Sequence, residues 1–300
     1  MSYEVIIPFL KPIEHLLAST TISEIMVNPD SSVWVEEAGQ VRPMPEISFD
    51  DGALQTGLEV IANRFGKKLD ADSPILNLRL PDGSRMAAII PPVVNPRPLL
   101  TIRKFTSKNF TLTDLIRVKM VTAEQADILS DAVREGQNVL IAGGTGSGKS
   151  TLLGVLADAI PERERILLIE DTAELHIRKP HIVSTESQTD THRSQITFDD
   201  LLKAVLRHRP DRIIVGEVRG PEARTLLDAM NTGHRGTLAT IHASSTEEAI
   251  RRLAALAIRG SVNLTLQMAE DDIRRSIHLV VFIRRSQEQR YVDSLLRVRS

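Results

Sequence analysis

The pattern of hydrophobic and polar residues changes near residue 105 and divides the chain into two parts. In the first part, short apolar runs at residues 25–27 and 33–35 flank turn-forming residues, which is typical of strands joined by tight turns. The apolar periodicity of residues 49–65 predicts one amphipathic helix with Ser48 as its N-cap. Further strands are expected at residues 76–80, 86–90 and 99–105. We predict a small α+β domain over residues 1–104.

The second part alternates regularly between apolar strands and amphipathic helices. Residues 105–121 are expected to form a linker with a short helix, and Thr122 with Gln125 then forms a capping box. Strands are expected at residues 138–142, 165–169, 181–185, 212–215 and 237–242, and helices at 149–159, 198–207, 222–230 and 247–258. This order predicts an α/β domain over residues 122–300, with a mostly parallel sheet covered by helices on both faces.

Composition limits the classes of protein that fit this pattern. The chain has 42% hydrophobic and 25% charged residues, as a folded globular protein does. Its 37 Lys and Arg against 39 Asp and Glu give a net charge of −2, so no overall attraction to nucleic acid is expected. With no cysteine, disulfides and Cys-ligated metals are excluded. No apolar run approaches a spanning helix of about 18 residues and no secretory signal is visible, so we expect a cytoplasmic chain.

Residues 143–150 match the phosphate-binding pattern G-x-x-x-x-G-K-[ST] at every fixed position. The match follows an apolar strand and opens a helix, which is the context this loop requires. The plain alternative is a glycine-rich turn with an exposed lysine. We expect ATP and Mg²⁺ to bind here, with Lys149 on the β- and γ-phosphates and Ser150 on the metal. The predicted binding residues are Gly143, Gly144, Thr145, Gly146, Ser147, Gly148, Lys149, Ser150 and Thr151.

Two groups of carboxylates follow later apolar strands. Residues 170–174 include Glu170, Asp171 and Glu174, and the second strand ends in Gly216 and Glu217. Strand ends at the carboxyl edge of a parallel sheet face the ligand, so these acids are candidates for orienting water and supporting Mg²⁺. The second strand resembles a Walker B strand in which Gly216 replaces the usual Asp. The plain alternative is that polar residues simply end a strand.

Two histidines, His234 and His242, flank the strand expected at residues 237–242. Their spacing is not that of a metal site. His242 at the strand end could report the presence of the γ-phosphate; the alternative is a pair of hydrogen-bonded structural histidines.

These segments together resemble the type II/IV secretion ATPase superfamily, in the branch that includes VirB11, TrbB and CpaF. The resemblance covers nearly the whole chain and does not depend on the phosphate-binding loop. It rests on residues 24–36, 82–85 and 101–105, on 169–175 as an Asp box, on 209–220 as a Walker B segment and on 230–243 as a His box.

The resemblance implies a RecA-like ATPase domain and a PAS-like N-terminal domain, assembled as a hexameric ring with ATP between the domains. By position, Glu174 would orient or activate the attacking water and Glu217 would support Mg²⁺. Which of the two carboxylates is the base stays open. His234 and His242 would couple the site to neighbouring elements.

The resemblance also implies arginines that complete the site. Arg85 and Arg103 would bring positive charge to the phosphates from the N-terminal domain, with Arg103 the stronger candidate and Arg193 a third. The alternative is that they are ordinary surface arginines.

The function expected from the resemblance is an ATP-hydrolysing motor subunit of a secretion, conjugation or pilus machine. Its partners would be copies of itself and an inner-membrane platform, at the inner face of the inner membrane. Two other classes stay open: a RecA-like nucleic-acid motor, which the acidic balance and 3% aromatic content disfavour, and a nucleotide-switched scaffold without hydrolysis. No direct binding of nucleic acid is expected.

Overall fold

The computed structural model describes residues 6–37, 39–50, 52–104, 110–171, 173–175, 177–187, 196–261, 264–286 and 289–298. The chain divides into two compact units, Met1–Lys108 and Asn109–Ser300. Helix α3 (Leu112–Arg117), inside the segment expected to be a linker, buries Leu115 in the core of the second unit.

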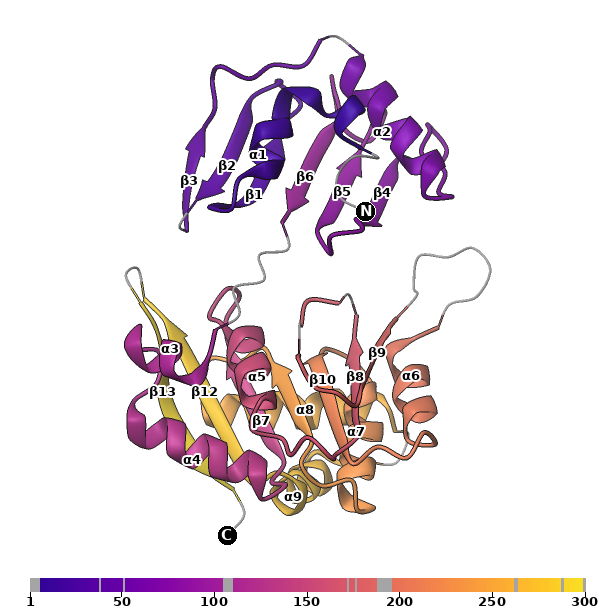
Figure 1. The fold of residues 1–300 in the computed structure, drawn as a ribbon. Helices are drawn as coiled ribbons and strands as arrows, with labels where there is room; N and C mark the ends of the chain where they lie inside the picture. The colour runs from indigo at the N-terminus through magenta and orange to yellow at the C-terminus, as the bar shows by residue number, and fades with distance from the viewer. Residues whose placement is uncertain are drawn as a thin grey trace. The chain divides into compact units, whose positions relative to one another are not determined.

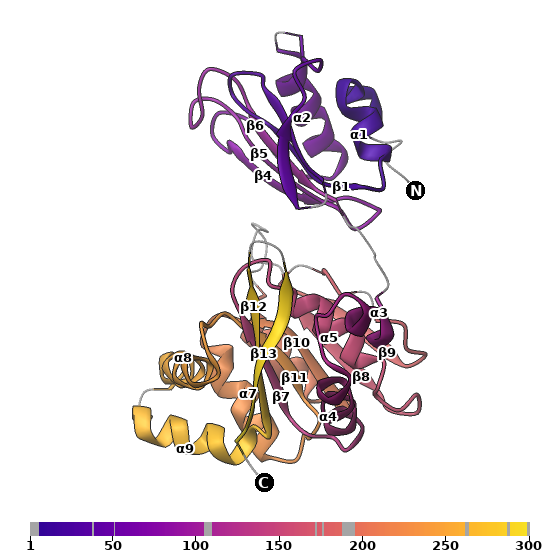
Figure 2. The ribbon, with the colours of Figure 1, turned by 90° about the vertical axis from the view of Figure 1, so that its left-hand side faces the viewer.

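The first unit is an antiparallel sheet with helices on one face (Figure 2). Its strands are β1 (Ile22–Val27), β2 (Val33–Glu37), β3 (Gln40–Pro43), β4 (Ile75–Arg79), β5 (Arg85–Ile89) and β6 (Leu99–Arg103), in the spatial order β3-β2-β1-β6-β5-β4. Short 3₁₀ turns at Ile7–Phe9 and Lys11–Ile13 precede helix α1 (Glu14–Ala18), and α2 is Ala53–Arg64. Alternate strand residues such as Ile25 and Ile102 face Leu58 and Ile61 of α2 in one core. The predicted α+β class is confirmed.

Helix α2 begins later than the sequence predicted. Its N-cap is Gly52 at φ 75°, and Ser48 lies ahead of it in a segment without regular secondary structure. Expecting Ser48 to be the N-cap was wrong because Gly52 adopts a left-handed turn immediately before the first helical residue, which a glycine does at little cost.

The second unit is built on a seven-stranded sheet within the described residues, in the order β13-β12-β7-β11-β10-β8-β9. All neighbours pair in parallel except the hairpin partners β12 and β13. The strands are β7 (Val139–Gly143), β8 (Ile166–Glu170), β9 (Ile182–Glu186), β10 (Arg212–Val218), β11 (Leu238–Ile241), β12 (Leu279–Arg285) and β13 (Arg290–Arg297). The predicted mostly parallel sheet is confirmed, whereas the β12–β13 hairpin was not predicted.

Helices cover both faces of this sheet, as predicted (Figures 1 and 2). One face packs against α3, α4 (Ala123–Arg134) and α5 (Lys149–Ala157). The other packs against α6 (Phe198–Val205), α7 (Glu222–Asn231), α8 (Thr246–Arg259) and α9 (Leu266–Ser276). The central strands are buried along their whole length because both of their faces are covered. Among the described residues, none of the helices has the length and apolar character needed to cross a membrane.

Parallel pairing sets the position of the candidate chemistry. Strands β7, β11, β10 and β8 are neighbours and end at the same edge of the sheet. That carboxyl edge therefore collects the loop after Gly143, His242 after β11, Glu217 near the end of β10 and Glu170 at the end of β8.

Candidate functional site

The loop between β7 and α5 has the shape of a phosphate cradle. Gly146 and Gly148 have φ angles of 66° and 97°, which side chains rarely allow. A Cβ on Gly143 would lie 2.5 Å from Ser147 Oγ and 2.7 Å from the Ile283 carbonyl oxygen. Ser147 is buried, and within the described residues its hydroxyl has no hydrogen-bond partner. The backbone turns inward at these glycines and leads directly into the N-terminus of α5, an arrangement that suits anions.

Lys149, the first residue of α5, points back over this loop. Its Nζ donates hydrogen bonds to the carbonyl oxygens of Gly143, at 3.0 Å, and Gly144, at 2.8 Å. Only 7% of the residue is exposed, and this burial lowers the pKa of Lys149, while the charge of Glu217 opposes the shift. Ser150 and Thr151 follow in the first helical turn, and Thr145 is exposed on the loop.

Glu217 lies at the centre of a polar cluster beside this lysine. Its Oε1 is 3.0 Å from His242 Nε2, and its Oε2 accepts a hydrogen bond from Arg219 Nη2 at 2.8 Å. Arg219 Nη1 is 3.4 Å from Asp171 Oδ2, at the end of the neighbouring strand. Three strands thus deliver one connected set of charged and polar groups to the carboxyl edge.

The cluster sets the protonation of His242. Burial lowers the pKa of His242 below its ordinary value; the charge of Lys149 lowers it further, and Glu217 opposes this. The lowered pKa favours the neutral form of the His242 ring. A neutral ring can hold the Glu217 carboxylate through one hydrogen bond without cancelling its charge, which leaves that carboxylate able to act on water or a metal.

Glu170 organises the segment that carries Glu174. Glu170 is 3% exposed, and its Oε1 accepts hydrogen bonds from the backbone N–H groups of Glu174, at 2.8 Å, and Leu175, at 2.9 Å. Glu174 itself is exposed, and its charge acts on both Lys149 and Arg219. Glu174 therefore belongs to the same electrostatic cluster as Glu217.

The space beside Gly216 explains the missing Asp of this Walker B strand. A Cβ on Gly216 would lie 3.0 Å from Glu170 Cγ, tighter than ordinary van der Waals contact. The buried Glu170 side chain, from the adjacent strand β8, occupies the place that an aspartate at position 216 would need. The glycine at position 216 and the buried Glu170 side chain therefore depend on each other.

The structure does not bring His234 to the phosphate loop within one copy of the chain. His234 precedes β11, at the opposite edge of the sheet from His242, and its Nδ1 lies 3.3 Å from the Ala229 carbonyl oxygen. Its own carbonyl accepts a hydrogen bond from Thr237 Oγ1.

The candidate arginines are distant in sequence from the residues of the Glu217 cluster. Arg85 and Arg103 belong to the first unit, where they are directly opposite each other on β5 and β6, with Arg79 opposite Arg85 on β4. The three form one row on a single sheet face. Arg193 lies outside the described residues.

Sequence reasoning missed two members of the cluster. Arg219 was not singled out, although it lies two residues beyond Glu217 and returns to the same face of the strand end. Glu170 was seen as part of an acidic run, but its buried position could not be predicted without knowing that β8 and β10 are neighbours.

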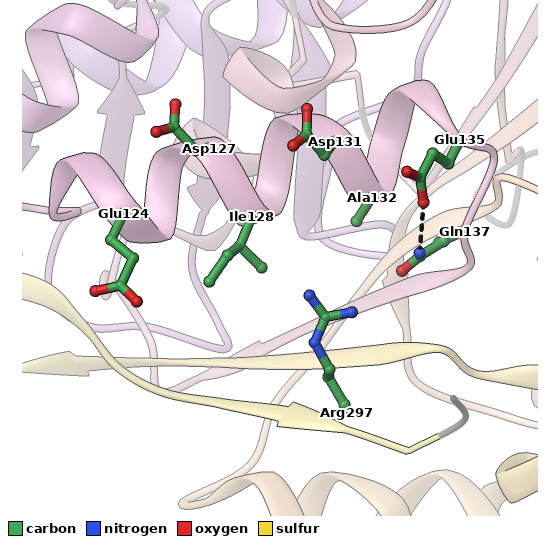
Figure 3. Close-up of a pocket in the computed structure, with 8 residues that line it drawn as sticks. All are labelled: Glu124, Asp127, Ile128, Asp131, Ala132, Glu135, Gln137 and Arg297. Carbon is green, nitrogen blue, oxygen red and sulfur yellow. Dashed lines mark hydrogen bonds between the residues drawn. The ribbon is translucent and has the colours of Figure 1, made fainter.

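A pocket of about 570 Å³ lies elsewhere, between α4 and the end of β13 (Figure 3). Its lining is dominated by acidic residues of α4, with Arg297 facing them from β13. The lining residues are Glu124, Asp127, Ile128, Asp131, Ala132, Glu135, Gln137 and Arg297. None of the predicted site residues is among them.

The donors at the carboxyl edge fit Mg²⁺. Ser150 and Glu217, both half-buried, offer a hydroxyl and a carboxylate, which are oxygen ligands of the hard type that Mg²⁺ prefers. Among the described residues, no group of three or more His, Asp and Glu could hold a metal by itself. The donor set suits an ion that shares its coordination with phosphates and water.

The fold and the phosphate-binding loop define the second unit as a RecA-like P-loop ATPase unit with an α+β unit ahead of it. The family described as "Type II/IV secretion system protein" matches residues 9–293, so the chain belongs to this family of secretion ATPases, in its VirB11 and TrbB branch.

Individual relatives agree with this assignment. The chain is 35% identical to a conjugal transfer protein TrbB of Rhizobium radiobacter, over 94% of this chain and 85% of that one. It is 32% identical to a type IV secretion system protein VirB11 of Bartonella quintana, over 90% and 85%. The crystal structure of the VirB11 ATPase of Brucella suis, in complex with sulphate, superposes with a TM-score of 0.54 at 25% identity, covering 98% of this chain and 94% of that one.

Proposed function

We propose that the chain hydrolyses ATP, with Mg²⁺, at the carboxyl edge of the second unit. The observation that carries this proposal is the convergence of Lys149, Glu217 and Glu174 beside the phosphate cradle, with Arg219 and His242 holding Glu217 in place. A structural turn would not need a buried lysine bonded to the loop's own carbonyls. In this position, phosphate oxygens of a bound nucleotide can replace the two carbonyl oxygens as hydrogen-bond partners of the lysine.

The residues divide the chemistry between them. Lys149 exchanges its two carbonyl partners for phosphate oxygens and offsets the charge that develops during transfer. Ser150 and Glu217 would hold Mg²⁺, which would supply positive charge to offset that of the phosphates. Glu174, held by the backbone bonds to Glu170, orients the attacking water and accepts its proton.

We propose that hydrolysis moves the first unit against the second within a ring of subunits. By resemblance to the family, we propose that this ring is a hexamer. Arg85 and Arg103 support this, because they are paired directly across β5 and β6 and so place two cationic residues side by side that could attract phosphate groups. Loss of the γ-phosphate would weaken that attraction and release the first unit.

The machine proposed for this motor is a type IV secretion or conjugation apparatus. The proposal follows the names of the relatives, which are a conjugal transfer protein and a type IV secretion system protein. The subunit would work on the cytoplasmic side of the inner membrane, against a platform of membrane proteins.

The test is phosphate release from Mg-ATP per chain, measured over a wide range of protein concentration. We expect a rate that rises and saturates, because a ring stabilises a complete site. Lys149→Ala should lower the rate by about a thousandfold, since it removes the cation on the transferred phosphate. Hydrolysis retained in Lys149→Ala would overturn the proposal, and so would the absence of any hydrolysis by the wild-type chain at every concentration.

A further inference from the structure

The β12–β13 hairpin brings two arginines to the phosphate-binding loop. Ile283 of β12 pairs with Gly143, where the loop begins, so Arg285 extends two residues beyond that point on the same strand face as Ile283. Arg285 Nη1 is only 2.7 Å from the position of a Cβ on Gly146. Arg290 lies opposite Arg285 on β13, and its Cδ is 3.9 Å from the corresponding position on Gly148.

The hairpin is fixed to the segment that precedes α4. Val292 N–H donates to the Met120 carbonyl oxygen at 2.8 Å, and Gln289 Nε2 donates to the Lys119 carbonyl oxygen at 3.0 Å. Gln125 Nε2 donates to the Val292 carbonyl oxygen at 3.2 Å. These hydrogen bonds hold the end of the hairpin beside the phosphate-binding loop. The positions of Arg285 and Arg290 are therefore fixed both by the pairing of β12 with β7 and by the contacts with residues 119–125.

The two guanidinium groups differ from their neighbour Arg284. Arg284 Nε is 3.0 Å from Asp293 Oδ1, and its guanidinium lies over the ring of Phe282, so its charge is already compensated. Within the described part of the chain, Arg285 and Arg290 are exposed and make no hydrogen bond or ion pair. Two arginines held side by side next to a glycine-rich loop form a site of positive charge that a phosphate group would stabilise.

The strand order says which end of a nucleotide they face. Glu217 and His242 follow β10 and β11, which lie on one side of β7, whereas β12 lies on the other side. In the proposed function, the reacting γ-phosphate lies beside Glu217 and Lys149. A nucleotide whose β-phosphate lies in the loop therefore extends its α-phosphate and ribose toward β12.

We infer that Arg285, supported by Arg290, binds the α-phosphate end of the nucleoside di- or triphosphate held by the loop. The inference rests on the proposed function, because it assigns a further binding residue to the same site. Arg285 acts on the bound nucleotide and not on the transferred phosphate, so its contribution is equal for ADP and ATP.

The test compares Arg285→Gln with the matched control Arg284→Gln, which removes the adjacent arginine on the opposite strand face. ADP and a non-hydrolysable ATP analogue are titrated by calorimetry, and KM and kcat for ATP are measured. In Arg285→Gln we expect affinity for both nucleotides to fall about tenfold, the loss of one charge-assisted hydrogen bond. KM should rise by a similar factor with kcat within about twofold. Arg285→Lys should recover part of the affinity, and Arg284→Gln should bind as the wild type does.

Equal ADP affinity in Arg285→Gln and the wild type would overturn the inference and leave the proposed function standing. A loss of kcat with unchanged ADP affinity would also overturn it, because Arg285 would then act at the γ-phosphate. A wild-type chain that binds neither nucleotide would overturn the inference and the proposed function together. Thermal unfolding of each variant shows whether a loss comes from the fold; if Arg285→Gln unfolds, the titrations with Arg285→Lys and Arg290→Gln decide.

Discussion

The two edges of the sheet in the ATPase unit both hold buried polar side chains, but they use them differently. At the amino edge, Arg212 is 4% exposed, pairs with Glu164 and donates to the Val133 carbonyl oxygen at 2.9 Å. Asn138 accepts from Thr237 N–H at 3.0 Å and donates to the Ser276 carbonyl oxygen at 2.7 Å. Buried polar groups there are satisfied by the chain itself.

At the carboxyl edge, the polar groups of the phosphate-binding loop are available to a ligand. Among the described residues, Lys149 Nζ donates only to the Gly143 and Gly144 carbonyl oxygens, and the Ser147 hydroxyl has no partner. Buried polar groups that hydrogen-bond within the chain stabilise the fold, whereas buried polar groups that are available to a ligand mark the functional site.

The largest effect is expected where the amino edge is broken. Arg212→Met should lower the free energy of unfolding by about 3 kcal/mol, because Glu164 and the Val133 carbonyl lose their buried partner. Denaturant titration measures it, with Arg134→Met as the control, since that arginine forms an exposed pair with Asp131. Equal stability of Arg212→Met and the wild type would show that the buried polar contacts of Arg212 do not stabilise the fold.

The next effect sharpens the carboxyl edge. Gly216→Asp restores the aspartate usual in a Walker B strand, yet we expect kcat to fall about a hundredfold, because the new side chain displaces Glu170 and with it the Glu174 segment. Gly216→Ala should fall between this variant and the wild type. Steady-state hydrolysis with a parallel ADP titration checks this, and a Gly216→Asp protein as active as the wild type would remove Glu170 from the account.

The smallest effect separates the two histidines that flank β11, His234 before it and His242 after it. His234→Gln should leave ADP affinity within about twofold of the wild type, because His234 lies at the amino edge. His242→Gln should lower kcat about tenfold through the loss of its bond to Glu217. Calorimetry and hydrolysis assays on both variants test the contrast, which would collapse if His234→Gln lost nucleotide binding.

Much of this unit was predictable because its signals are local. The phosphate-binding loop, the alternation of strands and helices and the capping box at Thr122 are each determined by residues close in sequence. The family resemblance added Glu174 and Glu217 as a pair.

What could not be predicted depends on which strands are neighbours. Gly216 makes sense only once β8 places Glu170 beside it, and Arg285 matters only because β12 lies next to β7. The start of α2 was misplaced for a different reason: the left-handed Gly52 outweighed a plausible serine cap. The pattern of the β12–β13 segment went unassigned since no motif drew attention to it.

The most direct measurement is hydrolysis and nucleotide binding by Glu217→Gln, which keeps the size of the side chain and removes its charge. If the carboxyl edge is the hydrolysis site, phosphate release should fall about a hundredfold while ADP affinity stays within about threefold of the wild type. Glu217→Gln protein that releases phosphate at the wild-type rate would contradict the central claim that this cluster performs the reaction.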